Sequence, residues 1–116
     1  MDWSRAMQVV QGDLQLLQEI VRAFLEEYPR MLDDIRGSIE KRDGAVLQRA
    51  AHTLKGSMRY FGAAEAFDQA YALECMGKER RFAEAAQQMP KLRDAIERLQ
   101  AVLVRFAETG KTSDAG

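Results

Sequence analysis

The feature that most constrains the fold of this chain is a long stretch in which apolar residues recur every three or four positions. Its members are Leu14, Leu17, Val21, Phe24, Tyr28, Leu32, Ile35 and Ile39. This period places the apolar side chains on one face of an α-helix. No stretch of comparable length alternates apolar and polar residues, as a half-buried strand would. The chain is therefore predicted to be all-α.

Turn-forming residues divide the chain into five predicted helices. After a short helix capped by Asp2, the others are expected over residues 13–41, 45–61, 63–76 and 82–106. Gly62 and Gly77 are the expected ends of the third and fourth helices, because glycine commonly follows the last helical residue. Pro29 and Pro90 are expected to bend the two longest helices, because proline removes a backbone hydrogen bond.

The connections between the predicted helices are short, so neighbouring helices should run antiparallel. We therefore expect an antiparallel up-and-down four-helix bundle with a short additional N-terminal helix. At 116 residues the chain is long enough for one domain and too short for two ordinary ones. Residues 1–108 are predicted to form this domain. Residues 109–116 are predicted to be a flexible C-terminal tail, because they are almost all polar or small.

Composition argues against several classes of function. Lys and Arg number 17 and Asp and Glu 18, which argues against broad binding to nucleic acid. No run of roughly 18 apolar residues is present, so insertion into a membrane is not expected, and no secretory signal is visible. Cys75 is the single cysteine and fits a reducing compartment, so the cytoplasm is the expected location. Because His52 is the single histidine, catalytic mechanisms and metal sites that need two histidines are excluded.

The position of His52 on the third helix decides whether it belongs to the core. With Leu47 set to zero and about 100° added per residue, the apolar residues of this helix fall within about 60° of Leu47. These residues are Ala50, Ala51, Leu54, Met58 and Phe61. His52 lies at about 140°, off the apolar face. Its neighbours there are Gln48, Lys55, Gly56 and Arg59. The ring is therefore predicted to lie on the surface, either as an ordinary solvated histidine or as a reactive one.

Gly56 favours the reactive alternative. Glycine in the middle of a helix costs about 1 kcal/mol relative to alanine. Close packing between helices does not explain it, because Gly56 lies nearly opposite the apolar face. We infer a surface on which a partner must come close to the imidazole. Lys55 and Arg59 flank this surface and would make it electropositive, although a solvated helix face would carry the same residues.

Glu74 on the fourth helix is a second candidate site residue. It is predicted to lie on the inward face of that helix, which Ala63, Phe67, Ala70 and Tyr71 define. A carboxylate turned toward a core interface needs a partner. The alternatives are a ring nitrogen of His52 and Lys78, four residues on, while Gln69 is a weaker candidate for the contact to the ring. If Glu74 accepts the Nδ1–H of His52, Nε2 is left free to attack, as in catalytic triads.

The residues from Ala51 to Ser57, Ala-His-Thr-Leu-Lys-Gly-Ser, and those from Phe61 to Ala63 resemble the signature of the histidine-containing phosphotransfer (HPt) domain. Further segments resemble the family pattern in order and spacing: Asp2-Trp3, Gly12-Asp13, Phe24-Leu25-Glu26-Glu27-Tyr28-Pro29 and Leu73-Glu74. The resemblance covers approximately residues 2–106. Family members often have small or amide residues where this chain has Met58, Arg59 and Tyr60, a departure that bears on the choice of partner.

The resemblance implies a helical bundle that accepts a phosphoryl group on an exposed histidine. The group is exchanged with aspartates of response-regulator receiver domains in phosphorelay signal transduction. By this resemblance His52 is the phosphorylation site and Lys55 stabilises the phosphoryl group. Gly56 would clear the approach to the ring, and Glu74 would bond the imidazole.

The expected partners are therefore receiver domains, with a sensor histidine kinase, in the same chain or separate, as a further candidate. Gln48 and Arg59 are expected to belong to the docking surface. No cofactor or metal site is expected on this chain, because no acidic cluster lies near His52, and Mg²⁺ should belong to the receiver partner. The chain is expected to be a phosphocarrier without autokinase activity rather than an enzyme. The alternatives are an adaptor that only binds a partner and, less favoured, a hydrolase that uses His52 as a general base with Glu74.

Overall fold

The computed structural model describes residues 1–112, and within this range it contains helices and no strand. The helices are α1 (Trp3–Val9), α2 (Leu14–Glu40), α3 (Gly44–Phe61), α4 (Ala64–Lys78) and α5 (Phe82–Thr109). The prediction of an all-α chain is confirmed. Helix α5 includes Thr109, the first residue of the predicted tail, and residues 113–116 of that tail lie outside the described residues.

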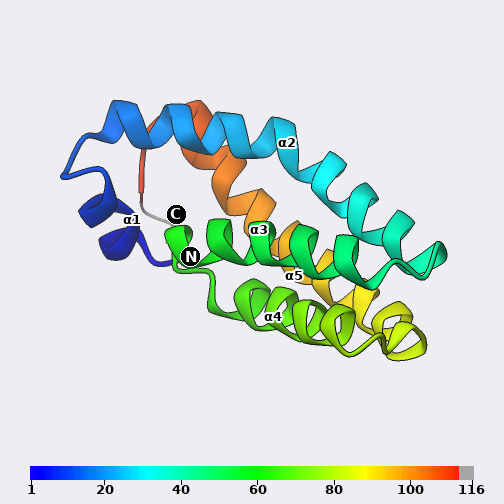
Figure 1. The fold of residues 1–116 in the computed structure, drawn as a ribbon. Coiled ribbons are helices and arrows are strands. Elements are labelled where there is room, and N and C mark those ends of the chain that lie inside the picture. The colour runs from blue at the N-terminus through cyan, green and yellow to red at the C-terminus, as the bar shows by residue number, and fades with distance from the viewer. Residues whose placement is uncertain (113–116) are drawn as a thin grey trace.

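Helices α2 to α5 form the predicted up-and-down bundle (Figure 1). Each helix packs against the next one in the chain, and α5 closes the ring by packing against α2. Helix α1 lies at one end of the bundle and contacts α2 and α3. The backbone N–H of Asp2 donates to the carbonyl of Phe61 at 2.9 Å, and the ring of Trp3 packs on that of Phe106 with centroids 4.9 Å apart. These contacts attach the N-terminal helix to the ends of α3 and α5.

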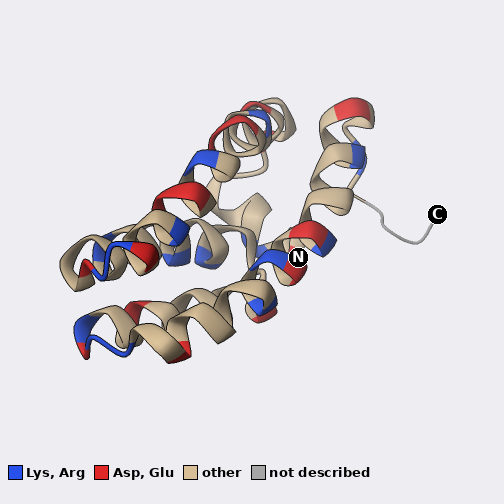
Figure 2. Cartoon of the chain, turned by 90° about the vertical axis from the view of Figure 1, so that its right-hand side faces the viewer, with Lys and Arg blue, Asp and Glu red and all other residues tan. Residues whose placement is uncertain are grey.

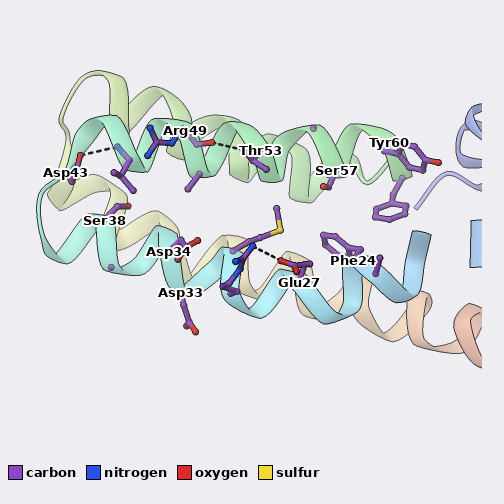
Figure 3. A pocket seen from close by; sticks show the side chains of 18 of the residues that line it. Phe24, Glu27, Asp33, Asp34, Ser38, Asp43, Arg49, Thr53, Ser57 and Tyr60 are labelled. Atoms are coloured by element: carbon purple, nitrogen blue, oxygen red, sulfur yellow. Dashed lines mark hydrogen bonds and ion pairs between the residues drawn. The ribbon is translucent and has the colours of Figure 1, made fainter. Parts of the chain in front are cut away.

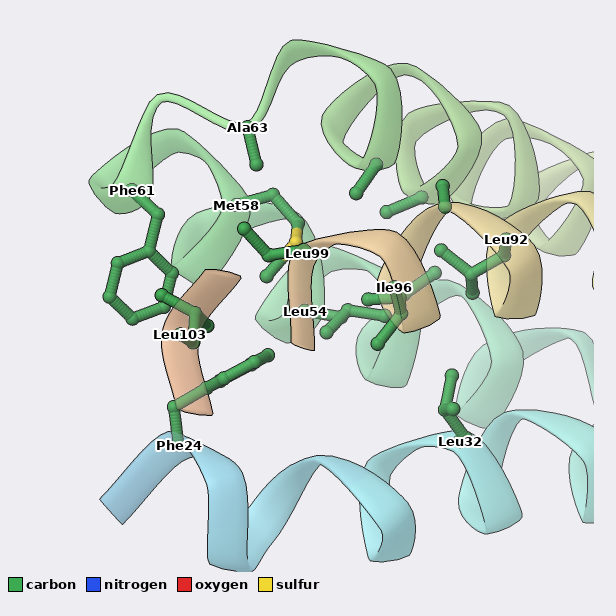
Figure 4. Close-up of a cluster of buried hydrophobic side chains, with 14 of the residues drawn as sticks. Phe24, Leu32, Leu54, Met58, Phe61, Ala63, Leu92, Ile96, Leu99 and Leu103 are labelled. Carbon is green, nitrogen blue, oxygen red and sulfur yellow. The ribbon is translucent and has the colours of Figure 1, made fainter. Parts of the chain in front are cut away.

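The core is built from the apolar faces that the sequence period predicts. Its largest fully buried side chains are Phe61, Phe106, Leu17, Ile35, Leu47, Leu54, Met58, Leu73, Leu92, Ile96, Leu103 and Val21. Figure 4 shows Phe24 and Leu32 of α2 facing residues of α3 and α5 across this core. The predicted α2 stripe is therefore the core face of the helix, except at its first residue, Leu14, which is 44% exposed.

Capping residues account for several of the helix boundaries. Asp2, Asp13 and Asp43 each accept a hydrogen bond from a backbone N–H in the first turn of the following helix, at 3.0–3.1 Å. Gly62 ends α3 in the left-handed region, with φ 63°, as predicted. The predicted helix end at Gly77 is wrong, because α4 continues through it to Lys78. Gly77 is buried there, and a Cβ atom added to it would lie 2.6 Å from the backbone nitrogen of Gln48 on α3.

Pro29 and Pro90 both lie inside helices that continue past them. Helix α2 changes direction partway along its length in Figure 1, which is the expected effect of a proline that removes a hydrogen bond from the helix interior.

Charged side chains of both signs are distributed over the helices. In Figure 2, segments with Lys or Arg are interspersed with segments that carry Asp or Glu, as the totals of 17 basic and 18 acidic residues lead one to expect. The electrostatics of any site on this surface therefore depend on local neighbours rather than on the net charge.

None of the helices in residues 1–112 is both long and apolar enough to cross a membrane.

Candidate functional site

His52 lies near the middle of α3 with 66% of its side chain exposed. The apolar face of α3 is buried, and its buried side chains include Leu47, Ala51, Leu54 and Met58. The predicted surface position of the ring is confirmed. The ring is directed toward α4, where its Nδ1 atom lies 3.0 Å from Oε2 of Glu74.

Glu74 on α4 joins two residues of α3. While Oε2 contacts the His52 ring, Oε1 lies 2.8 Å from Nζ of Lys55, one turn further along α3. This ion pair with Lys55 compensates the burial of Oε1. The alternative prediction, that Glu74 pairs with Lys78, is therefore wrong.

The environment of Glu74 keeps its carboxylate charged. Burial raises the pKa of Glu74, but the contacts with Lys55 and His52 outweigh burial and leave the pKa below its usual value. An ionised carboxylate only accepts hydrogen bonds, so Nδ1 of His52 must be the donor. In the neutral ring the other nitrogen, Nε2, then carries the free lone pair. The contact with Glu74 thus selects the tautomer whose exposed nitrogen is a nucleophile.

Acid should remove the stabilisation that Glu74 provides. Because the pKa of Glu74 in the folded chain is lower than its ordinary value of 4.5, its contribution to folding is present above that value and is lost as the pH falls through the folded pKa. We compare the wild type with Glu74→Gln. The difference in their free energies of unfolding, measured by urea denaturation, should be present above about pH 5 and shrink as the pH falls below that value. A difference that does not change down to pH 2 would contradict this assignment.

Lys55 lies deeper than the helical count predicted. Only 13% of its side chain is exposed, and its Nζ lies 5.1 Å from the centroid of the Tyr71 ring. The count measured directions around α3 alone and took no account of α4, which covers this side of the helix. Lys55 is therefore a cation held at the α3–α4 seam, and not a free charge in solvent.

The prediction that Tyr71 lies on the inward face of α4 is wrong. The buried residues of this helix are Ala66, Ala70, Leu73 and Gly77, whereas Tyr71 is 51% exposed. Tyr71 is a neighbour of the site that the sequence analysis missed. The available signal was its spacing of three residues from Glu74, which places both on one side of α4.

The two predicted docking residues lie on either side of His52 along α3. Gln48, one turn before the histidine, is half-buried against α4. Arg59 is exposed, but its guanidinium lies over the ring of Phe67, 5.4 Å from the centroid. The positive charge that the sequence predicts around His52 is therefore partly engaged in contacts with residues of α4.

Gly56 has no packing partner. A Cβ atom added at this position would meet nothing within 4 Å. Gly56 lines a groove of about 1020 Å³ between α2 and α3. Figure 3 shows these helices as the two walls, with Phe24 and Tyr60 toward one end and Ser38 and Asp43 toward the other. The helix surface beside the histidine is therefore open, as the sequence analysis predicted.

Comparison with known families gives a match over most of the described chain. A family model described as Hpt domain matches residues 19–102, a range that contains every predicted site residue. No curated protein and no solved structure matches the chain. Among residues 1–112, no cluster of three or more His, Cys, Asp or Glu side chains is arranged to hold a metal ion.

Proposed function

The chain belongs to the Hpt domain family, whose members are phosphocarrier modules of histidine phosphorelays, and we propose that this chain carries its phosphoryl group on His52. The observation that carries the proposal is the contact of 3.0 Å between His52 Nδ1 and Glu74 on an otherwise exposed ring. The contact supports Nε2 as the nucleophile, and the exposure of the ring supports access by a partner protein.

The proposed reaction takes its phosphoryl group from an aspartyl phosphate on the partner. Nε2 of His52 attacks the phosphorus atom, an N–P bond forms, and the bond between phosphorus and the carboxylate oxygen breaks. The aspartate leaves as a carboxylate, and the positive charge that the imidazole gains lies beside Glu74. The reverse sequence passes the group to a second aspartate. Positioning and charge neutralisation are what such a transfer requires of a protein.

Lys55 is the proposed stabiliser of the phosphoryl group. It lies one turn from His52 on α3, and the ion pair with Glu74 and the ring of Tyr71 hold its Nζ at the seam. A phosphoryl oxygen about 4 Å from the ammonium would gain about 1 kcal/mol in water and about 4 kcal/mol at intermediate dielectric, per unit charge. The proposal therefore gives Lys55 two anionic partners, Glu74 before transfer and the phosphoryl group after it.

Receiver domains of response regulators are the proposed partners, with a sensor histidine kinase as a further one. Gly56 and the groove between α2 and α3 leave room for a partner to approach beside the ring. Gln48 and Arg59 are proposed to lie at the border of that contact. We propose no cofactor for this chain and assign Mg²⁺ to the receiver. The cytoplasm is the proposed compartment, since the single thiol, Cys75, is free.

A receiver domain that carries a radiolabelled aspartyl phosphate tests the proposed function. When it is mixed with this chain, label should leave the receiver and appear on the chain as an acid-labile phosphoramidate. Spontaneous hydrolysis of the receiver alone is the control for loss of label. If the two proteins bind and the label stays on the receiver, the chain is an adaptor, and the proposal is wrong.

A further inference from the structure

Helices α3 and α4 touch backbone to backbone about one turn away from His52. A Cβ atom added to Gly77 would lie 2.6 Å from the backbone nitrogen of Gln48 and 3.0 Å from Cγ of Leu47. From the other side, a Cβ atom on Gly44 would lie 2.7 Å from the carbonyl oxygen of Gly77. Real Cβ atoms essentially never lie within 3.0 Å of such a neighbour, so the last turn of α4 fits against α3 only because glycine occupies both positions.

Glycine is required at position 77 because a side chain has no space there, and not because the backbone adopts a positive φ. The glycines with positive φ are Gly12, Gly62 and Gly110. Gly77 lies inside α4, where glycine lowers helix stability relative to alanine. The close approach of the two helices is therefore maintained against the helix propensity of α4.

This contact lies next to the residues that fix the imidazole. Gln48 precedes His52 by four residues on α3, and Gly77 follows Glu74 by three on α4, so one helical turn separates the contact from the site on each helix. Because Glu74 holds His52 with one oxygen and Lys55 with the other, a change in the distance between the helices stretches both contacts at once. A single change of side-chain rotamer does not restore both.

We propose that Gly77 is a positioning residue, which holds α4 close enough to α3 for Glu74 to bridge His52 and Lys55. This inference rests on the proposed function for its role in phosphoryl transfer. The geometric part concerns only the tautomer of His52. With a methyl group at position 77, backbone atoms must separate by roughly 1 Å, which takes the 3.0 Å contact between Nδ1 and Oε2 beyond hydrogen-bond range.

The first test is the Gly77→Ala variant of the full chain, with the tautomer of His52 read from its ring ¹⁵N chemical shifts. In the wild type the signals should report a proton on Nδ1, and in the variant a mixture of both tautomers. Gly37→Ala is the matched control, because it makes the same substitution inside α2, where an added Cβ atom meets nothing within 4 Å. A folded Gly77→Ala with the wild-type tautomer overturns the proposal.

The second test asks whether Gly77 acts through Glu74. Gly77→Ala should slow labelling of His52 by a phosphorylated receiver roughly tenfold to a hundredfold, as expected for a misplacement of about 1 Å. In a Glu74→Ala background the same substitution should add no further loss. Equal losses in both backgrounds would show that Gly77 acts independently of Glu74 and overturn the proposal. If no label ever reaches the wild type, the proposed function fails, while the tautomer measurement still decides the role of Gly77.

A variant that does not fold is also informative. If Gly77→Ala is unfolded by circular dichroism, Gly44→Ala replaces it, because there the added methyl group presses on the carbonyl of Gly77 and on the flexible side chain of Arg80. The same tautomer mixture is expected from it. Loss of folding in both variants would overturn the positioning role in favour of a purely structural one.

Discussion

Replacing His52 by glutamine should abolish labelling of this chain by a phosphorylated receiver domain while the bundle stays folded. Glutamine can still donate a hydrogen bond toward Glu74, but its amide nitrogen carries no nucleophilic lone pair. Since 66% of the His52 side chain is exposed and none of it contributes to the core, the free energy of unfolding should change by no more than about 1 kcal/mol. Label transfer and urea denaturation measure the two effects.

A surface substitution of the same kind is the control for the His52 variant. Arg105→Gln changes an exposed residue of α5 and should keep the wild-type rate. Label that reaches His52→Gln at the wild-type rate would place the phosphoryl group elsewhere and refute the assignment of His52.

Gly56→Gln should slow transfer from the receiver roughly tenfold or more, without loss of stability. A Cβ atom added at this position meets nothing within 4 Å, so the change from glycine should leave the free energy of unfolding unchanged or raise it by up to about 1 kcal/mol. The same side chain would stand on the exposed surface one turn from His52, in the path of a docking protein. Labelling rates over a range of receiver concentrations, together with thermal unfolding, check both statements.

Two comparisons isolate the steric effect at Gly56. A small phosphoramidate donor does not dock on the helix surface, so it should phosphorylate the Gly56→Gln variant at nearly the wild-type rate. Gly37→Gln makes the same substitution in α2, in the same groove but at a site with open space. It should be slowed less than Gly56→Gln if the approach to the ring is what Gly56 clears. Retained transfer from the receiver to Gly56→Gln would show that this glycine has no steric role.

The fold of this chain was predictable because its determinants are local. The period of apolar residues places Leu17 and Val21 in the core of α2. Asp2 caps α1, and Gly62 ends α3 with positive φ, because capping depends on a few neighbouring residues. The prediction that Gly77 ends α4 was wrong because the role of this glycine is not local. A glycine can end a helix or let a neighbouring helix pack closely, and only the position of the second helix distinguishes these uses.

The candidate site divides in the same way. The sequence by itself determined that His52 lies off the apolar face of its helix and that Gly56 has no place in the core, because both follow from the angle of about 100° per residue. Only the tertiary structure decided that Glu74 contacts His52 and Lys55 rather than Lys78, and that Lys55 is largely covered. Those contacts depend on the separation and rotation of α3 and α4. Packing between residues far apart in the chain sets this separation and rotation. The periodicity of a single helix carries no information about either.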